Sequence, residues 1–197
     1  MADTYSGVRK TVMGASKPYW AKIKTEADNS LPTYDTGMAF SEFIKLTESI
    51  SMAEAEFYSD DALSENANEF KNCELTYENK GLSDEIMSAI YGMDYTDGVL
   101  TYGGDDEEPM GGFGYYRTIM DKGVKYYEGV FYPKVKASLG NDTTDTKGDS
   151  ITFAGATTRM IAYQCKDAKK TWKVTKMCGT AAEAESWVKT QLGMAGT

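Results

Sequence analysis

Two segments of this chain carry its clearest structural pattern: Ala53-Glu54-Ala55-Glu56-Phe57-Tyr58 and Glu69-Phe70-Lys71-Asn72-Cys73-Glu74-Leu75-Thr76-Tyr77-Glu78. Because successive side chains of a strand point to opposite faces, each segment as a strand has one apolar face and one acidic face. In the second segment Cys73, Leu75 and Tyr77 form the apolar face. The polar residues 59–66 between the segments predict a turn. The stretch therefore predicts a hairpin in an antiparallel sheet with one packed side.

The polar side of this hairpin carries four carboxylates, those of Glu54, Glu56, Glu74 and Glu78. Strands of half-buried sheets normally present a polar side to water, so a solvated face is the simplest interpretation of these residues taken alone.

The string from Glu56 to Ala62, Glu-Phe-Tyr-Ser-Asp-Asp-Ala, is followed by the alternating acidic strand. Together they resemble the major tail protein family of long-tailed bacteriophages, and the resemblance continues to about Tyr163 in the order of strands and helix. It implies a mainly β fold, an antiparallel β-sandwich of the tail-tube type with one flanking helix, over residues 1–178. It also implies hexameric rings that stack into the tube through which DNA leaves the capsid. The four glutamates would then face the lumen.

Length and composition fit a globular chain: 197 residues, 41% hydrophobic residues, fourteen tyrosines and nineteen glycines. The net charge of −9 disfavours tight nucleic-acid binding, which needs phosphate neutralisation by Lys and Arg, but it permits DNA to slide past. Three distant cysteines favour reduced thiols. We expect a soluble chain without a secretion signal or membrane binding, since it has no long apolar stretch.

Helix signals occur twice. Ser83 is a candidate N-cap for a helix that ends at Gly92. Thr180 and Glu183 predict a capping box for a helix to Leu192, so residues 179–197 are interpreted as a C-terminal helical extension beyond the sandwich.

Residues 111–137 predict a second hairpin, with Asp121-Lys122-Gly123 as its turn. Aromatic residues fall on both faces of its strands, so each face must be covered, by the helices or by a neighbouring subunit. The candidates for a subunit interface are Phe113, Tyr115, Tyr116, Tyr126, Tyr127, Phe131 and Tyr132.

Two polar segments are long for idle connections: residues 1–17, interpreted as an extended N-terminal arm, and residues 138–150. The candidates for contacts between stacked rings are Asn141, Asp142, Asp145 and Lys147. After them, residues 151–165 predict a strand that pairs with residues 172–177.

Three classes of function remain to be weighed. The chain has no histidine and no nucleophile with an evident base, and its adjacent acids do not face one another, so neither an enzyme nor a metal or cofactor site is expected. A monomeric β-sandwich that binds carbohydrate or protein is an alternative, as is the tube of a phage-tail-like bacteriocin. The preferred interpretation is a structural virion protein, assembled in the bacterial cytoplasm. Its partners would be copies of itself, the tape measure, terminator and distal tail proteins, and DNA in passage.

Overall fold

The computed structural model describes residues 5–59, 62–140 and 156–194. Its elements, in chain order, are β1 (Thr11–Thr25), β2 (Thr33–Tyr34), β3 (Met38–Ala39), β4 (Phe43–Ser59), β5 (Ala62–Asn79), α1 (Asp84–Tyr91), β6 (Asp94–Thr96), β7 (Val99–Thr101), β8 (Met110–Asp121), β9 (Val124–Ser138), β10 (Ala156–Ala162), β11 (Val174–Cys178) and α2 (Ala181–Gln191).

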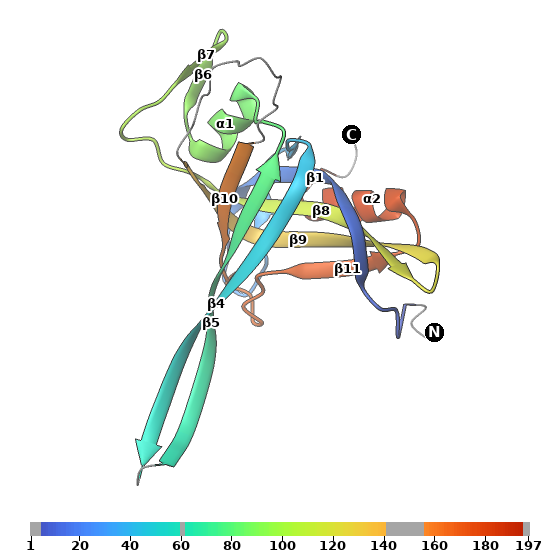
Figure 1. Cartoon of the computed structure of the whole chain (residues 1–197). Helices are drawn as coiled ribbons and strands as arrows, with labels where there is room; N and C mark the ends of the chain where they lie inside the picture. Colours follow the sequence, from blue (N-terminus) through green and yellow to red (C-terminus); the bar gives the residue numbers. More distant parts are fainter. Residues whose placement is uncertain (1–4, 60–61, 141–155, 195–197) are drawn as a thin grey trace, which may run out of the picture.

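Nine strands form one bent antiparallel sheet in the order β2-β1-β8-β9-β10-β5-β4, with β3 beside β1 and β11 beside β9. Strand β9 belongs to both halves of the sheet: its first part pairs with β11 and its last part with β10. The half made of β4, β5 and β10 therefore turns away from β1, β8 and β11 (Figure 1). Strands β6 and β7 form a separate small hairpin.

The main core lies between the two halves of the sheet. Cys73, Leu75 and Tyr77 of β5 are fully buried there, as their alternation predicts. The ring of Tyr77 packs on Phe113 of β8 at a centroid distance of 5.9 Å, which joins the two layers. The antiparallel β-sandwich with two helices is confirmed.

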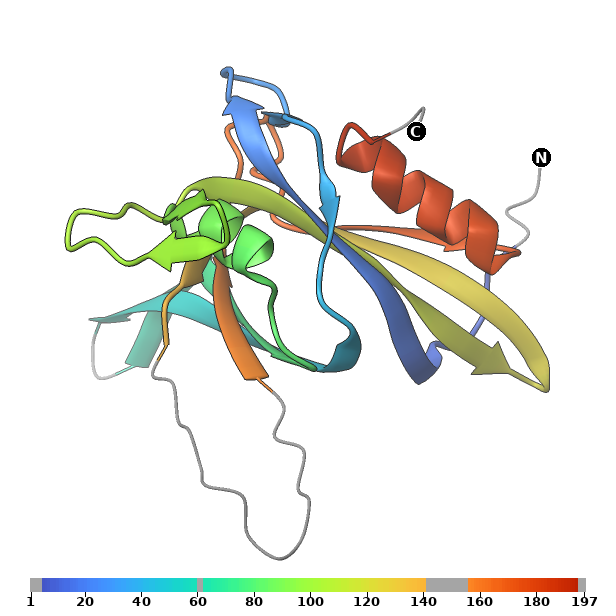
Figure 2. The ribbon, with the colours of Figure 1, turned by 90° about the horizontal axis from the view of Figure 1, so that it is seen from above.

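Both helices begin and end where their local signals predict. The Ser83 side chain accepts a hydrogen bond from the Ile86 amide, and Gly92 ends α1 with a left-handed φ of 76°. Thr180 and Glu183 form the capping box of α2. The α2 helix lies against the outer face of β1, β8, β9 and β11, so residues after 178 add a second small core to the sandwich (Figure 2).

The second hairpin has the predicted turn: Lys122 and Gly123 both have positive φ, 49° and 83°, as a two-residue type I′ connection requires.

Three local predictions are wrong. Strand β5 begins at Ala62, so most of the expected turn at residues 59–66 is strand. Residues 11–17 are not a free arm but the start of β1, which pairs with β8 and bulges before Pro18, where Lys17 has a φ of 56°. Strand β11 pairs with β9, whereas the sequence predicted the segment before it, now β10, as its partner. Short polar strands depend on their neighbours, which local patterns do not show.

Candidate assembly surface

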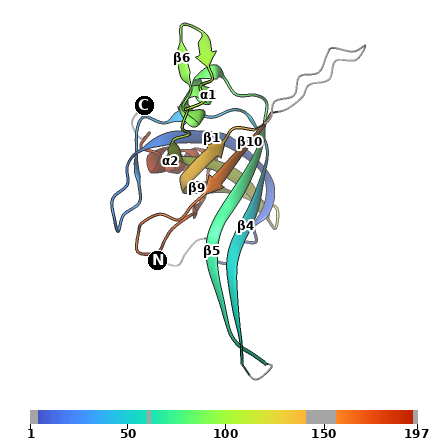
Figure 3. The ribbon, with the colours of Figure 1, turned by 90° about the vertical axis from the view of Figure 1, so that its left-hand side faces the viewer.

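The hairpin β4–β5 extends far beyond the rest of the molecule (Figures 1 and 3). Its ladder runs from the pair Phe43–Asn79 to the pair Ser59–Ala62. Strand β10 pairs with β5 only from Cys73 to Asn79. We call residues 51–59 and 62–72 the arm. Among the described residues, no third strand pairs with the arm on either edge.

The root of the arm is fixed by an aromatic contact. The ring of Phe70 stacks on Trp172 with centroids 4.8 Å apart, and Gln164 Nε2 donates a hydrogen bond to the Phe70 carbonyl at 3.0 Å. The segment that precedes β11 therefore holds the arm where it leaves the body.

A polar cluster lies next to this contact. Lys173 Nζ is 2.5 Å from Glu48 Oε1 and 5.4 Å from the centroid of the Tyr132 ring. The Tyr132 hydroxyl also donates a hydrogen bond to the Glu48 carboxylate. Burial is the main cause that raises the pKa of Tyr132 far above its usual value, and the nearby Tyr115 and Glu48 raise it further. The Tyr132 hydroxyl therefore keeps its proton and remains a hydrogen-bond donor. The cluster ties β4 to β9 and to the start of β11.

The four glutamates predicted to share one face do not all share it. Ile50 pairs with Cys73 and Glu48 with Leu75, so up to the bulge after Ser51 the even-numbered residues of β4 share a face with the odd-numbered residues of β5. Alternation from Glu48 puts Glu54 on that same face. Glu74 and Glu78 lie on the opposite one. The single acidic face is therefore wrong, because the register between the strands, which alternation within each strand cannot supply, decides which faces coincide.

Glu74 is exposed, and Glu78 Oε1 lies 3.4 Å from Lys45 Nζ. Glu56 pairs with Asn66 in the part of the arm whose side chains lie outside the description.

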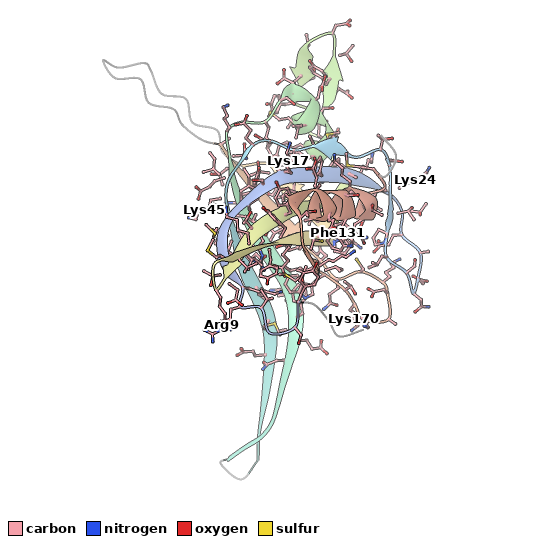
Figure 4. The ribbon with its side chains drawn as sticks, turned by 90° about the vertical axis from the view of Figure 1, so that its right-hand side faces the viewer. Arg9, Lys17, Lys24, Lys45, Phe131 and Lys170 are labelled. Atoms are coloured by element: carbon pink, nitrogen blue, oxygen red, sulfur yellow. The ribbon has the colours of Figure 1, made fainter. Side chains whose placement is uncertain are left out.

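The seven aromatic residues proposed for a subunit interface divide into two groups. Phe113, Tyr115 and Tyr132 are buried in the main core. Phe131 lies on the other face of β9, under α2 (Figure 4). These four are therefore covered within the subunit and are not available to a partner, so their assignment to an interface is wrong. The second aromatic face is covered by the subunit's own helix.

Tyr116, Tyr126 and Tyr127 are only half-buried. The rings of Tyr116 and Tyr127 meet edge to face at 6.2 Å, and Tyr126 meets Tyr5 in the same way at 6.2 Å. These three remain candidates for an interface. The ring-stacking candidates Asn141, Asp142, Asp145 and Lys147 lie outside the described residues, so that assignment stays a prediction.

Charge is distributed unevenly along the chain. Residues 43–79 hold nine carboxylates against two lysines, so −7 of the net −9 belongs to the β4–β5 hairpin. Two other segments are basic: residues 5–25 contain five cations and no acid, and residues 166–176 contain five lysines and one aspartate.

Features of a reactive or metal-binding site are few. Within the described ranges, no three Cys, Asp or Glu residues lie together as metal ligands would. Cys73, Cys165 and Cys178 are buried free thiols, and burial is the main cause that raises the pKa of Cys165 to about 12. A groove of about 380 Å³ between β1 and the start of β4 is lined by residues 15–19 and 39–43.

No protein-family model matches this chain, and a search of curated proteins found no match. In the part of the chain that the structure describes, no helix has the length and apolar character of a membrane span.

Proposed function

We propose that this chain is a structural subunit that assembles with copies of itself into hexameric rings, which stack into the tail tube of a long-tailed bacteriophage. The observation that carries the proposal is the arm. A two-stranded ribbon without a further strand or helix is only marginally stable in water. Its unpaired edges are templates for pairing with another chain. An arm of this length is therefore best explained by a partner that covers it.

The side chains at the root of the arm favour the same conclusion. Ile50 and Met52 are 51% and 46% exposed although both lie on the face of β4 that continues from the core, and Ile44 at the start of the strand is 57% exposed. Exposed apolar residues grouped on an edge strand mark a contact with another protein.

Two of the strand edges that pair with nothing among the described residues are those of β4 and β11. Association of one edge with a different edge of the next copy is head to tail, and such association closes into a ring when the rotation allows it. A ring of this kind removes both exposed edges at once.

The tube would act as the conduit for DNA ejection within the virion. The exposed face of β5 with Glu74 and Glu78 is the candidate for its lumen, because an acidic wall makes no salt-sensitive phosphate contacts and lets DNA slide. The tape measure, terminator and distal tail proteins would be the other partners, met during assembly in the host cytoplasm.

The test is to shorten the arm. Replacing residues 53–69 with Asn-Gly keeps the Met52–Phe70 pair and closes it with a favoured two-residue turn. We expect the wild-type chain to form rings or tubes as concentration rises, seen by light scattering and negative-stain microscopy. The shortened chain should keep its thermal unfolding transition and stay monomeric. A wild-type chain that is monomeric at every concentration and salt would overturn the proposal, as would a shortened chain that assembles normally.

A further inference from the structure

We propose that the arm of one subunit docks along the free edge of β11 in a second copy, where Lys169, Lys170 and Lys176 face its carboxylates. This inference rests on the proposed self-assembly and identifies the two surfaces that meet.

The donor surface is the arm. The sequence between Ser51 and Asn72 contains six carboxylates and one lysine. Glu54 and Glu69 are exposed in the described part of the arm, and neither forms an ion pair with any described residue. The arm is thus acidic by sequence, and its two described carboxylates are not neutralised by an ion pair within the described part of the subunit.

The acceptor surface is the segment 166–176. Two of its five lysines are already paired: Lys166 with Asp28 at 3.6 Å and Lys173 with Glu48 at 2.5 Å. Lys169, Lys170 and Lys176 are exposed and form no ion pair within the described ranges.

The backbone of β11 completes this surface. Residues Val174–Cys178 pair with β9 on one side, and in the described structure no strand lies on the other. Free main-chain donors and acceptors therefore run along β11, which contains Lys176 and follows the turn with Lys169 and Lys170, and strand addition at a sheet edge requires such free groups.

The arm cannot reach β11 of its own subunit. Phe70 is held against Trp172 at the root, and from there the arm leads away from the body while β11 follows β9 in a different direction (Figures 1 and 3). A second copy must therefore supply the edge.

The two surfaces are different parts of the molecule, as a head-to-tail contact requires. Figure 4 shows Lys170 on the body of the molecule, from which the arm extends away. Because donor and acceptor are different surfaces, the arm of each copy docks on a second copy, while its own β11 edge receives the arm of a third.

The decisive experiment reverses charge on either surface. The variant Lys169→Glu/Lys170→Glu/Lys176→Glu should raise the concentration at which rings form by about tenfold or more at low salt, since three attractive contacts become repulsive. The arm variant Glu54→Lys/Glu69→Lys should have a similar effect. Joining all five substitutions in one chain should restore part of the lost assembly, because the two introduced lysines can then face the introduced glutamates.

The matched control reverses three cations on the other basic segment, Arg9→Glu/Lys22→Glu/Lys24→Glu. Its assembly should change less than that of the β11 variant. If this control loses assembly and the β11 variant does not, the arm docks on β1 and the proposal is wrong.

Zero-length carbodiimide cross-linking of a mixture of isotope-labelled and unlabelled wild-type chains gives an independent readout. Links between chains should join Glu54 or Glu69 to Lys169, Lys170 or Lys176. Wild-type assembly without these links, together with unchanged assembly of the β11 variant, would overturn the docking site and leave the proposed function standing. Absence of wild-type assembly would overturn both.

Discussion

Glu128 is a fully buried carboxylate that binds two cations. Its oxygens accept hydrogen bonds from Lys10 Nζ and, at 2.5 Å, from Arg117 Nε. Burial alone would raise the pKa of Glu128, but the two cations act against it and the net shift is downward. The carboxylate therefore stays charged and connects the segment before β1 to the hairpin β8–β9. Removing one member of such a cluster leaves charge buried without a partner.

The substitution Glu128→Gln should lower the free energy of unfolding near neutral pH by about 3 kcal/mol. A carboxyl whose folded pKa is depressed stabilises the fold above its unfolded pKa, near 4.5, and this contribution is lost as pH falls through the folded value. The difference in free energy of unfolding between the wild type and the variant should therefore shrink below pH 4.5. Urea unfolding over a pH series measures it.

A suitable control for this substitution is Glu108→Gln, which removes a partly exposed partner of Lys136. It should cost less than about 1 kcal/mol. If both variants lost the same free energy of unfolding, the burial of Glu128 would contribute nothing to the effect of its substitution.

At the scale of single elements, α2 is held by close packing against strands that have glycines at the contact: Gly112, Gly114 and Gly129. Ala184, Val188 and Leu192 are buried, and the Tyr19 hydroxyl of β1 donates to Glu185 at 2.5 Å. A Cβ on Gly129 would lie 2.4 Å from the Trp187 ring. The absence of that atom is what lets the helix approach β9.

The substitution Gly129→Ala should therefore destabilise the docked helix, by about 1–3 kcal/mol if the ring of Trp187 shifts only in part. Compared with the wild type, the variant should show a larger increase in amide hydrogen exchange in α2 than in β5. Its melting temperature should also be lower. The matched change Gly104→Ala, at a loop position where a Cβ meets nothing within 4 Å, should leave both unchanged. Unaltered exchange in α2 of Gly129→Ala would refute the packing argument.

At the scale of the whole molecule, charge is separated between an acidic hairpin and basic segments. Separation of this kind agrees with the proposed association between copies, in which the cations would face carboxylates of another subunit. The proposed lumen face on β5 keeps only Glu74 and Glu78 of the four predicted glutamates.

Replacing these two residues, Glu74→Lys/Glu78→Lys, should cost little stability because both are at the surface. Tubes of the variant should retain linear DNA in sedimentation at low salt and release it as salt rises, whereas wild-type tubes should not retain it. The control Asp105→Lys/Glu107→Lys makes the same change of net charge on an exposed loop. If the control tubes retain DNA equally, position on β5 is irrelevant and the lumen assignment fails.

The candidate site could be predicted only in part. The hairpin itself and the inward side chains Cys73, Leu75 and Tyr77 followed from alternation. The placement of Glu54 did not, because it depends on which residue of β4 faces Cys73. The burial of Phe131 could not be predicted from alternation either, because the helix that covers it lies fifty residues later in the sequence.

The sequence by itself determined the features that depend on neighbours along the chain: the Ser83 and Gly92 ends of α1, the Thr180–Glu183 capping box, and the Lys122-Gly123 turn. Each rests on a hydrogen bond or a backbone angle within a few residues. Only the tertiary structure decided the partners of β9, the register of the arm and the burial of Glu128. These depend on contacts between distant segments, whose energies come from packing and pairing that no local pattern contains.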